Sequence, residues 1–316
     1  MQKTYITFIP LIALFAIFTI FIAVIMTSNQ AAHAAQATVN LRTASPFAIL
    51  SGTPNITDAG NTSVINGNVG LSPGTGAGNG LTCSQVTGTI YSVDATGPLP
   101  CRVTNGPLLV TAKNNLTAAY NDAAGRTPLT TVPTELGGTT RVAGVYDSSS
   151  TRFGISAGAG PLILDGQNDP SSVFIFEAPF SGTGLNVNSG STVSLINGAQ
   201  ACNVFWRVDT AAIDTTANFV GTILALNSIT VANGATIQGR LLARNGNVTL
   251  INDTITAPIC AGNDTGDDGY GDGSVVPGLP NSGEMSSPYI LWGALSLLFV
   301  TSSSLIAYVV YKKRSL

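Results

Sequence analysis

Charged residues are scarce in this sequence, at 9% of its 316 residues, and the net charge is only −3. Glutamate occurs three times, at Glu135, Glu177 and Glu284, and Lys113 is the single lysine between residues 27 and 288. Because surface helices usually draw on these two residue types, the composition argues against a mostly helical fold. The eight arginines of the same stretch are dispersed, so the sequence lacks the basic stripe of a nucleic-acid-binding protein.

Histidine is almost absent as well. The one histidine, His33, precedes Ala34, after which we expect an export signal to be cleaved, so the mature chain would contain none. Catalysis by a Ser–His or Cys–His pair is then excluded, as is a zinc site with histidine ligands. The four cysteines form no Cys-x-x-Cys pair, and we predict no metal and no cofactor.

Catalysis by carboxylates alone, as in glycoside hydrolysis, stays open as a weaker alternative. The acidic candidates are Asp165, Asp169, Glu177, Asp209 and Asp214. No spacing marks two of them as a pair, and roles in turns and caps explain them more simply. The sequence therefore favours a protein without catalytic activity.

Two long apolar runs lie near the ends of the chain. The run Ile6–Met26, followed by Ala32-His33-Ala34, predicts a signal peptide over residues 1–34, and an uncleaved anchor is the alternative. The run 289–311 predicts a transmembrane segment, and the basic tail 312–316 that follows it would lie in the cytoplasm. We therefore expect the bulk of the chain to be exported.

One amphipathic helix is predicted over about residues 107–124, between Pro107 and Gly125. Its apolar residues recur at steps of three and four, as a helix packed on a sheet requires: Leu109, Ala112, Leu116, Ala119, Tyr120 and Ala123.

The second half of the chain repeats itself, with a step of about 18 residues that is typical of one coil of a parallel β-helix. Gly221–Asn227 aligns with Gly239–Asn245, and Ile237 recurs as Ile255. The abundance of Gly, Thr, Asn and Val in place of Glu and Lys fits short strands joined by turns. The residues expected to point inward and stack from coil to coil are Ile223, Leu241, Ile229, Val248, Ile237 and Ile255.

Export would allow the cysteines to form disulfides. Three pairings are possible, and we favour Cys83 with Cys101 and Cys202 with Cys260, because each pair brackets one local segment.

Residues 261–278, rich in Gly and Asp, predict a flexible acidic linker. Their aspartates lack the spacing of a calcium-binding loop.

Several ordered motifs resemble the ice-binding-like domain family of bacteria, fungi and diatoms. They are Phe47–Gly52, Gly67–Gly74, Ala118–Ala123, Gly144–Tyr146, Leu164–Pro170, Val173–Phe176, Asn203–Val208, Gly221–Ala225 and Gly239–Ala243. The resemblance covers about residues 44–259 of a domain that we place at 35–260. It implies a mainly β fold, an irregular right-handed three-sided parallel β-helix with one long flanking α-helix.

The resemblance also implies a flat ice-binding surface built from short Thr-Ala/Gly-x-Thr/Asn segments at the corners of the coils. The candidate residues are Ser189, Thr192, Thr215, Asn218, Asn233, Thr236 and Thr254. Stacked coils would hold their hydroxyl, amide and methyl groups in a rigid array about 4.8 Å apart. The alternative is that these residues are the ordinary polar surface of a β-helix.

The segment 279–283 resembles a sortase sorting signal, carried here by Leu279, Pro280, Ser282 and Gly283, with serine in place of the usual threonine. The resemblance implies cleavage between Ser282 and Gly283 and attachment to the cell envelope, with the segment 289–311 holding the chain in the membrane until then.

These features together predict a monomeric cell-surface protein that adsorbs to an ice crystal through one side of a β-helix. Its other expected partners are a sortase and the cell envelope. A surface adhesin that binds carbohydrate or protein through the same solenoid is the main rival.

Overall fold

The computed structural model describes residues 36–260, apart from the side chains at 179–181. The expected signal peptide, acidic linker, sorting signal, transmembrane segment and basic tail lie outside the described residues. Within 36–260, no helix is both long and apolar enough to cross a membrane.

The described chain is mainly β, with one α-helix, α2 (Gly106–Ala124). Its first nine strands are β1 (Phe47–Ser51), β2 (Ile56–Asp58), β3 (Val64–Asn66), β4 (Asn68–Leu71), β5 (Ile90–Ser92), β6 (Arg102–Thr104), β7 (Leu129–Val132), β8 (Thr140–Val142) and β9 (Gly144–Ser148). The others are β10 (Phe153–Ile155), β11 (Leu162–Asp165), β12 (Phe174–Val187), β13 (Val193–Ile196), β14 (Val204–Ile213), β15 (Asn218–Ala225), β16 (Ile229–Val231), β17 (Thr236–Ala243), β18 (Val248–Leu250) and β19 (Thr254–Thr256). Short 3-10 helices include η1 (Arg42–Ala44) and η5 (Ala201–Asn203).

The strands pair in parallel, as in a solenoid. Gly221 of β15 pairs with Gly239 of β17, and Ile237 pairs with Ile255 of β19, which confirms the predicted repeat. Ile229 pairs with Val248, one residue further along, where the sequence also slips by one. All six residues predicted to point inward are buried.

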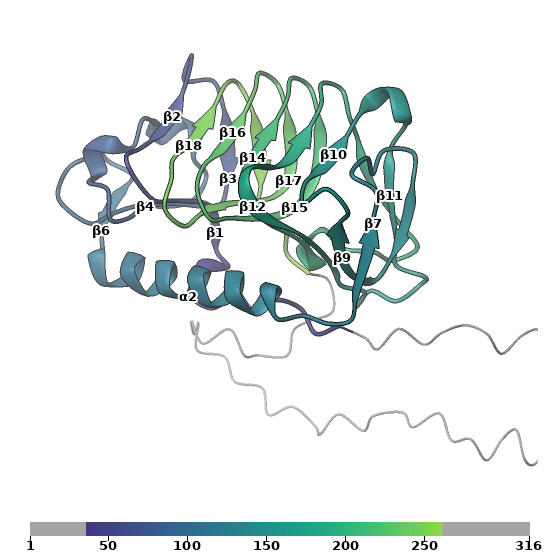
Figure 1. Cartoon of the computed structure of the whole chain (residues 1–316). Coiled ribbons are helices and arrows are strands. Elements are labelled where there is room, and N and C mark those ends of the chain that lie inside the picture. The colour runs from purple at the N-terminus through teal and green to yellow at the C-terminus, as the bar shows by residue number, and fades with distance from the viewer. Residues whose placement is uncertain (1–35, 261–316) are drawn as a thin grey trace, which may run out of the picture. The chain divides into compact units, whose positions relative to one another are not determined.

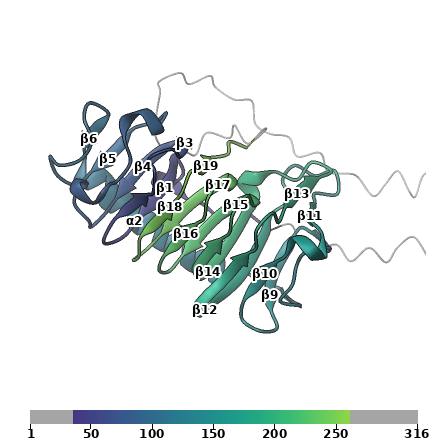
Figure 2. The same cartoon turned by 90° about the horizontal axis from the view of Figure 1, so that it is seen from above.

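The order of the coils in space differs from their order in the chain. The last coil, β17–β19, pairs on its open edge with β1, β2 and β3, so the first coil stacks on the last. In Figure 2 the purple N-terminal strands accordingly lie beside the yellow-green C-terminal ones. The chain passes from the β6 end toward the β7 end through α2, which runs along most of the stack (Figure 1).

Three sides can be defined from the strand pairings. The helix side contains β1, β4, β9 and residues 174–178, 204–208, 222–225 and 240–243. The threonine side contains β2, β10, β16, β18 and residues 183–187 and 210–213. The third side contains β3, β19 and residues 218–220 and 236–238. Each coil therefore bends three times.

Glycine is required at the bend between the third side and the helix side. A Cβ on Gly239 would overlap the carbonyl oxygen of Gly221 in the coil beneath, which no side chain tolerates. Gly221 itself has a φ of +117°, a conformation that other residues rarely adopt.

Large aromatic side chains fill the interior of the wider coils. Trp206 stacks on Phe176 of the neighbouring coil, with ring centroids 4.1 Å apart, and also contacts Phe219 of its own coil and Phe153 of β10. The indole N–H donates to the carbonyl oxygen of Val220 at 3.0 Å. The core is therefore continuous along the stack, although no single coil could bury it alone.

Helix α2 packs on the helix side through the apolar stripe that the sequence predicts. The Asn105 side chain caps it by accepting the N–H of Leu108, and Pro107 occupies its first turn. All six stripe residues are buried, against partners that include Leu50, Phe205, Leu224 and Leu242.

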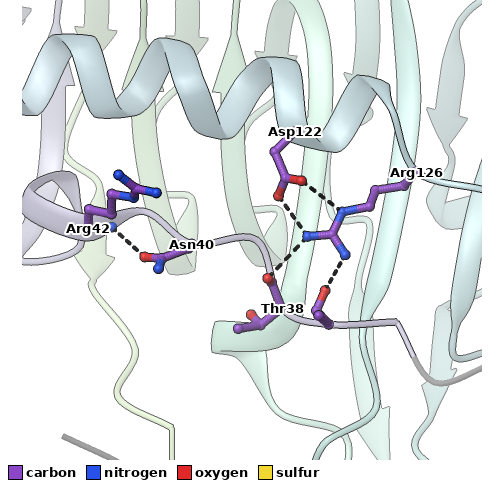
Figure 3. Close-up of polar contacts among 6 residues, drawn as sticks. Thr38, Asn40, Arg42, Asp122 and Arg126 are labelled. Atoms are coloured by element: carbon purple, nitrogen blue, oxygen red, sulfur yellow. Dashed lines mark hydrogen bonds and ion pairs between the residues drawn. The ribbon is translucent and has the colours of Figure 1, made fainter. Parts of the chain in front are cut away.

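The N-terminal segment is tied to the C-terminal end of α2 (Figure 3). Arg126 pairs with Asp122 at 2.7 Å and donates to the carbonyl oxygens of Ala37 and Thr38. Asn115 of the helix also donates to Thr43. The N-terminal segment therefore lies along the helix.

Both favoured disulfides are confirmed. Cys83–Cys101 closes the loops at the β6 end, and Cys202–Cys260 joins η5 to the last described residue.

Candidate functional site

Four of the predicted site residues form a straight row on the third side. Thr192 bridges to Asn218, Asn218 pairs with Thr236, and Thr236 pairs with Thr254. We call these four residues the corner row. It continues into the first coil with Val64, whose side chain is 45% exposed, so the polar row ends there.

The other three predicted residues, Ser189, Thr215 and Asn233, lie in the turns that precede the row. Backbone hydrogen bonds link these turns from coil to coil: Gly190 donates to Thr215 and Thr216 donates to Asn233. The structure therefore brings all seven predicted residues to one edge of the solenoid, between the threonine side and the third side.

A buried column supports this edge from inside. It contains Ser191, Ala217, Ala235, Asp253 and Ser63, one from each successive coil. The carboxylate of Asp253 accepts the N–H groups of Ala235 and Ile251, and its own N–H donates to Ser63. Burial raises the pKa of Asp253 to about 6 despite these hydrogen bonds.

A second uncharged row lies on the threonine side. Asn186 pairs with Ala212, Ala212 with Thr230, Thr230 with Thr249, and Thr249 with Thr57. We call these five residues the threonine ladder. Their side chains point outward, because the neighbouring strand residues Ile229, Val231, Val248 and Leu250 are buried.

Hydrogen bonds between side chains fix part of the threonine ladder. The hydroxyls of Thr57 and Thr249 are 3.3 Å apart, and Asn247 donates to the Thr249 hydroxyl at 3.0 Å. Ser228 in turn donates to Asn247 at 2.7 Å. Such contacts restrict the rotamers of Thr57 and Thr249, so this part of the ladder is ordered before any ligand arrives.

Two arginines close to these rows in sequence point elsewhere. Arg240 is buried and donates to the carbonyl oxygens of Ser45 and Pro258. Arg244 lies over the ring of Tyr120 from α2, 4.8 Å from its centroid. Both guanidinium groups therefore belong to the helix side, and neither row contains a charged residue.

Four of the five acidic candidates for catalysis have side-chain partners in the fold. Glu177 pairs with Arg207 at 3.2 Å on the helix side, and burial raises the pKa of this carboxyl group. Asp209 accepts hydrogen bonds from Gly182 and Asn227, Asp165 from Gln167 and Asn197, and Asp169 from Ser171. Asp214 precedes a corner turn.

Metal coordination finds no support in the part of the chain that the structure describes. It contains no group of three or more His, Cys, Asp or Glu side chains that could hold a metal ion.

Known proteins are similar to this chain in both sequence and architecture. The family model described as ice-binding-like matches residues 49–256. An ice-binding protein from Colwellia sp. is 43% identical over 224 residues, which cover 70% of this chain and 84% of the relative. An ice-binding protein from Flavobacterium frigoris is 40% identical over 224 residues, covering 70% and 76%.

This chain belongs to the ice-binding-like family. Among solved structures, the domain of Shewanella frigidimarina ice-binding protein 1 superimposes with a TM-score of 0.62 at 28% identity. The match covers 71% of this chain and 99% of that domain. The predicted parallel β fold with one flanking helix is thereby confirmed as the architecture of the family.

Sequence reasoning in terms of the family motif missed the threonine ladder. A signal for it existed, because Ile229-Thr230-Val231, Val248-Thr249-Leu250 and Ile56-Thr57-Asp58 each place one threonine between two buried positions. This alternation predicts an outward threonine at the centre of each short strand. The pairing of Thr249 with Thr57, 192 residues apart, needs the structure.

Proposed function

We propose that this protein binds ice, that the threonine ladder is the centre of the binding surface and that the corner row borders it. Binding is by adsorption, without catalysis, and the protein acts as a monomer. The observation that carries the proposal is the uncharged ladder of Thr230, Thr249 and Thr57 on directly paired strands. Membership of a family whose relatives are named ice-binding proteins supports it.

The physical basis is the order of the ladder before binding. Parallel strands repeat the threonine hydroxyl and methyl groups about 4.8 Å apart on a backbone that is already fixed. Water held between the methyl groups can then take up an ice-like arrangement, and the protein loses little conformational entropy when the crystal surface adds to it. A charged side chain would hold its own hydration shell and interrupt this arrangement.

The position of the two ends of the described residues, 36 and 260, favours the threonine side over the third side as the binding surface. Residues 36–43 lie along α2, and Pro258 accepts a hydrogen bond from Arg240, which also donates to Ser45 beside β1. The chain leaves β19 on the third side, where Ala257 donates to Asn66. The threonine side carries neither end of the described residues 36–260, which supports it as the side that contacts a flat crystal surface.

Thermal hysteresis and ice recrystallisation inhibition by the chain from Ala35 to Ser282 test the proposal. Thr230→Tyr places a bulky ring on an exposed ladder position and should lower thermal hysteresis several-fold. Thr236→Tyr, in the corner row, should lower it less. The matched control is Asn114→Tyr on the outer surface of α2, which should leave it unchanged.

Other results would redirect the proposal. Equal losses at Thr230 and Thr236 would mean that both sides contact ice, and loss at Thr236 alone would move the site to the corner row. A wild-type chain with no effect on ice at high concentration would refute ice binding, and glycan-array binding by that inactive chain would favour an adhesin.

We also propose export and attachment to the cell envelope. The support is the apolar run 6–26, the segment 279–283 and the apolar run 289–311 with its basic tail. Mass spectrometry of the protein released from cells by wall-degrading enzymes tests this proposal. A chain that begins near Ala35 and carries a cell-wall fragment on Ser282 is expected, whereas an intact C-terminus would indicate a plain membrane anchor.

A further inference from the structure

The described chain ends at Cys260, which is joined to Cys202 across 58 positions of sequence. Between these two cysteines lie β14 to β19, with Thr230 and Thr249 of the ladder and three residues of the corner row. The disulfide therefore closes the central coils of the proposed binding surface into a covalent loop.

The last coil is also held from both sides. Strand β18 lies between β16 and β2, and β19 lies between β17 and β3. Residues 240–243 of β17 likewise lie between β15 and β1. In a solenoid whose coils follow sequence order, the C-terminal coil is the end of the stack and can peel away alone. Here, peeling it breaks pairs with two neighbours at once.

We propose that the Cys202–Cys260 disulfide and the first coil form a mechanical clamp, which keeps the ice-binding surface folded when the chain is pulled through its C-terminus. This inference rests on the proposed attachment and ice binding. Tension entering at Cys260 passes through the disulfide to Cys202 at the start of β14, inside the stack. The residues between the two cysteines carry none of it along their backbone.

The disulfide prevents a large extension of the chain under tension. The 58-residue separation corresponds to about 200 Å of extended chain, at roughly 3.4 Å per residue. Without the disulfide, the same tension acts first on β19, then on β18 and β17, and each coil that comes away lengthens the chain by about 60 Å.

The Cys83–Cys101 disulfide provides a matched control. It closes a loop of similar chemistry at the β6 end, outside the path from Cys260 to Cys202. Its removal should therefore leave the response to C-terminal tension unchanged, whereas removal of Cys202–Cys260 should change it.

Single-molecule pulling tests the clamp without any ice. One handle is placed at Ser149→Cys, in the exposed turn after β9, and the other follows Ser282 in the chain from Ala35. The oxidised chain and Cys83→Ala/Cys101→Ala should show no early steps of about 60 Å. In Cys202→Ala/Cys260→Ala, steps of about 60 Å should be the first unfolding events, and together they should lengthen the chain by about 200 Å.

Two outcomes would overturn the proposal. One is a first unfolding event that has the same force and the same increase in length in the wild type and in Cys202→Ala/Cys260→Ala. The other is early loss of the coils in Cys83→Ala/Cys101→Ala. If the double variant of the clamp does not fold, reduction of the folded wild-type chain during the pull replaces it, and the same steps must then follow cleavage of the disulfide.

A second assay links the clamp to ice. Beads that carry the protein by its C-terminus are pulled repeatedly from an ice surface. Wild type should rebind after each detachment, and Cys202→Ala/Cys260→Ala should lose rebinding within a few cycles; equal rebinding would contradict the clamp. If the wild type never adheres, the proposed function fails, and the pulling result stands independently.

Discussion

Truncation of Trp206 should be among the most damaging changes in the solenoid. Its ring stacks on Phe176 at 4.1 Å and meets Phe219 and Phe153 at 5.4 and 6.2 Å, so it contacts aromatic rings from β12, β15 and β10. Its side chain is fully buried, and its N–H is the partner of the Val220 carbonyl oxygen.

The expected cost follows from these contacts. Trp206→Ala removes a buried ring from a core whose walls are fixed by strand pairing, so the cavity cannot collapse and we expect a loss of about 4–5 kcal/mol. Trp206→Phe keeps most of the ring contacts but leaves the Val220 carbonyl oxygen unpaired, which costs about 1–2 kcal/mol.

Urea unfolding at equilibrium, with both disulfides intact, measures these losses. Wild type, Trp206→Phe and Trp206→Ala should unfold in order of decreasing urea midpoint with the same slope. Equal losses for the two variants, or a loss for Trp206→Ala no larger than that of one unpaired carbonyl oxygen, would refute the view that the stacked ring supports the coils.

Three further changes probe other parts of the fold. Gly239→Ala forces a Cβ into the Gly221 carbonyl oxygen and should cost about 3 kcal/mol in urea unfolding, whereas Gly158→Ala, whose Cβ meets nothing within 4 Å, should be neutral. Loss of Cys202–Cys260 should destabilise the chain by about 4 kcal/mol and loss of Cys83–Cys101 by about 3 kcal/mol, because the first disulfide closes the longer loop. A larger loss of stability without Cys83–Cys101 than without Cys202–Cys260, measured by calorimetry, would contradict this reasoning. Burial raises the pKa of Asp253 from 3.8 to about 6, so its contribution to the free energy of unfolding is full below about pH 4 and is lost as the pH rises through 6. In Asp253→Asn, the free energy of unfolding should therefore change less with pH between about 4 and 6. The same pH dependence in the variant and the wild type would show that Asp253 does not titrate there.

Local pattern predicted much of the architecture. The helix with its stripe from Leu109 to Ala123 and the repeat that aligns Gly221 with Gly239 are periodic signals, and both were correct. The two disulfides were correct because each joins cysteines that bracket a local segment.

The arrangement of the coils could not be predicted in the same way. The pairing of β1 with β17 and of β2 with β18 joins strands from opposite ends of the described chain, and no repeat links them. The steps across the threonine ladder are also uneven, with Asn186 and Ala212 separated by a longer stretch of chain than Ala212 and Thr230. A ladder assembled across such steps appears only when the strands are stacked.

The family motif led to residues at the edge of the surface. It marked Thr192, Asn218 and Thr236, which the structure brings into one row with the further candidate Thr254. The motif describes the turns, where the backbone conformation requires glycine and small residues. It does not include the short strands between the turns. The outward threonines of those strands therefore escaped it.

The central claim is that the threonine ladder adsorbs to ice, and partition into growing ice tests it most directly. The chain from Ala35 to Ser282, labelled with a fluorophore on its N-terminus, is mixed with the Thr230→Tyr variant carrying a second fluorophore while a hemisphere of ice grows slowly in the solution. The wild type should enter the ice and the variant should be left in the liquid. Equal partition of the two proteins would contradict the ladder as the binding surface, and exclusion of both would contradict ice binding.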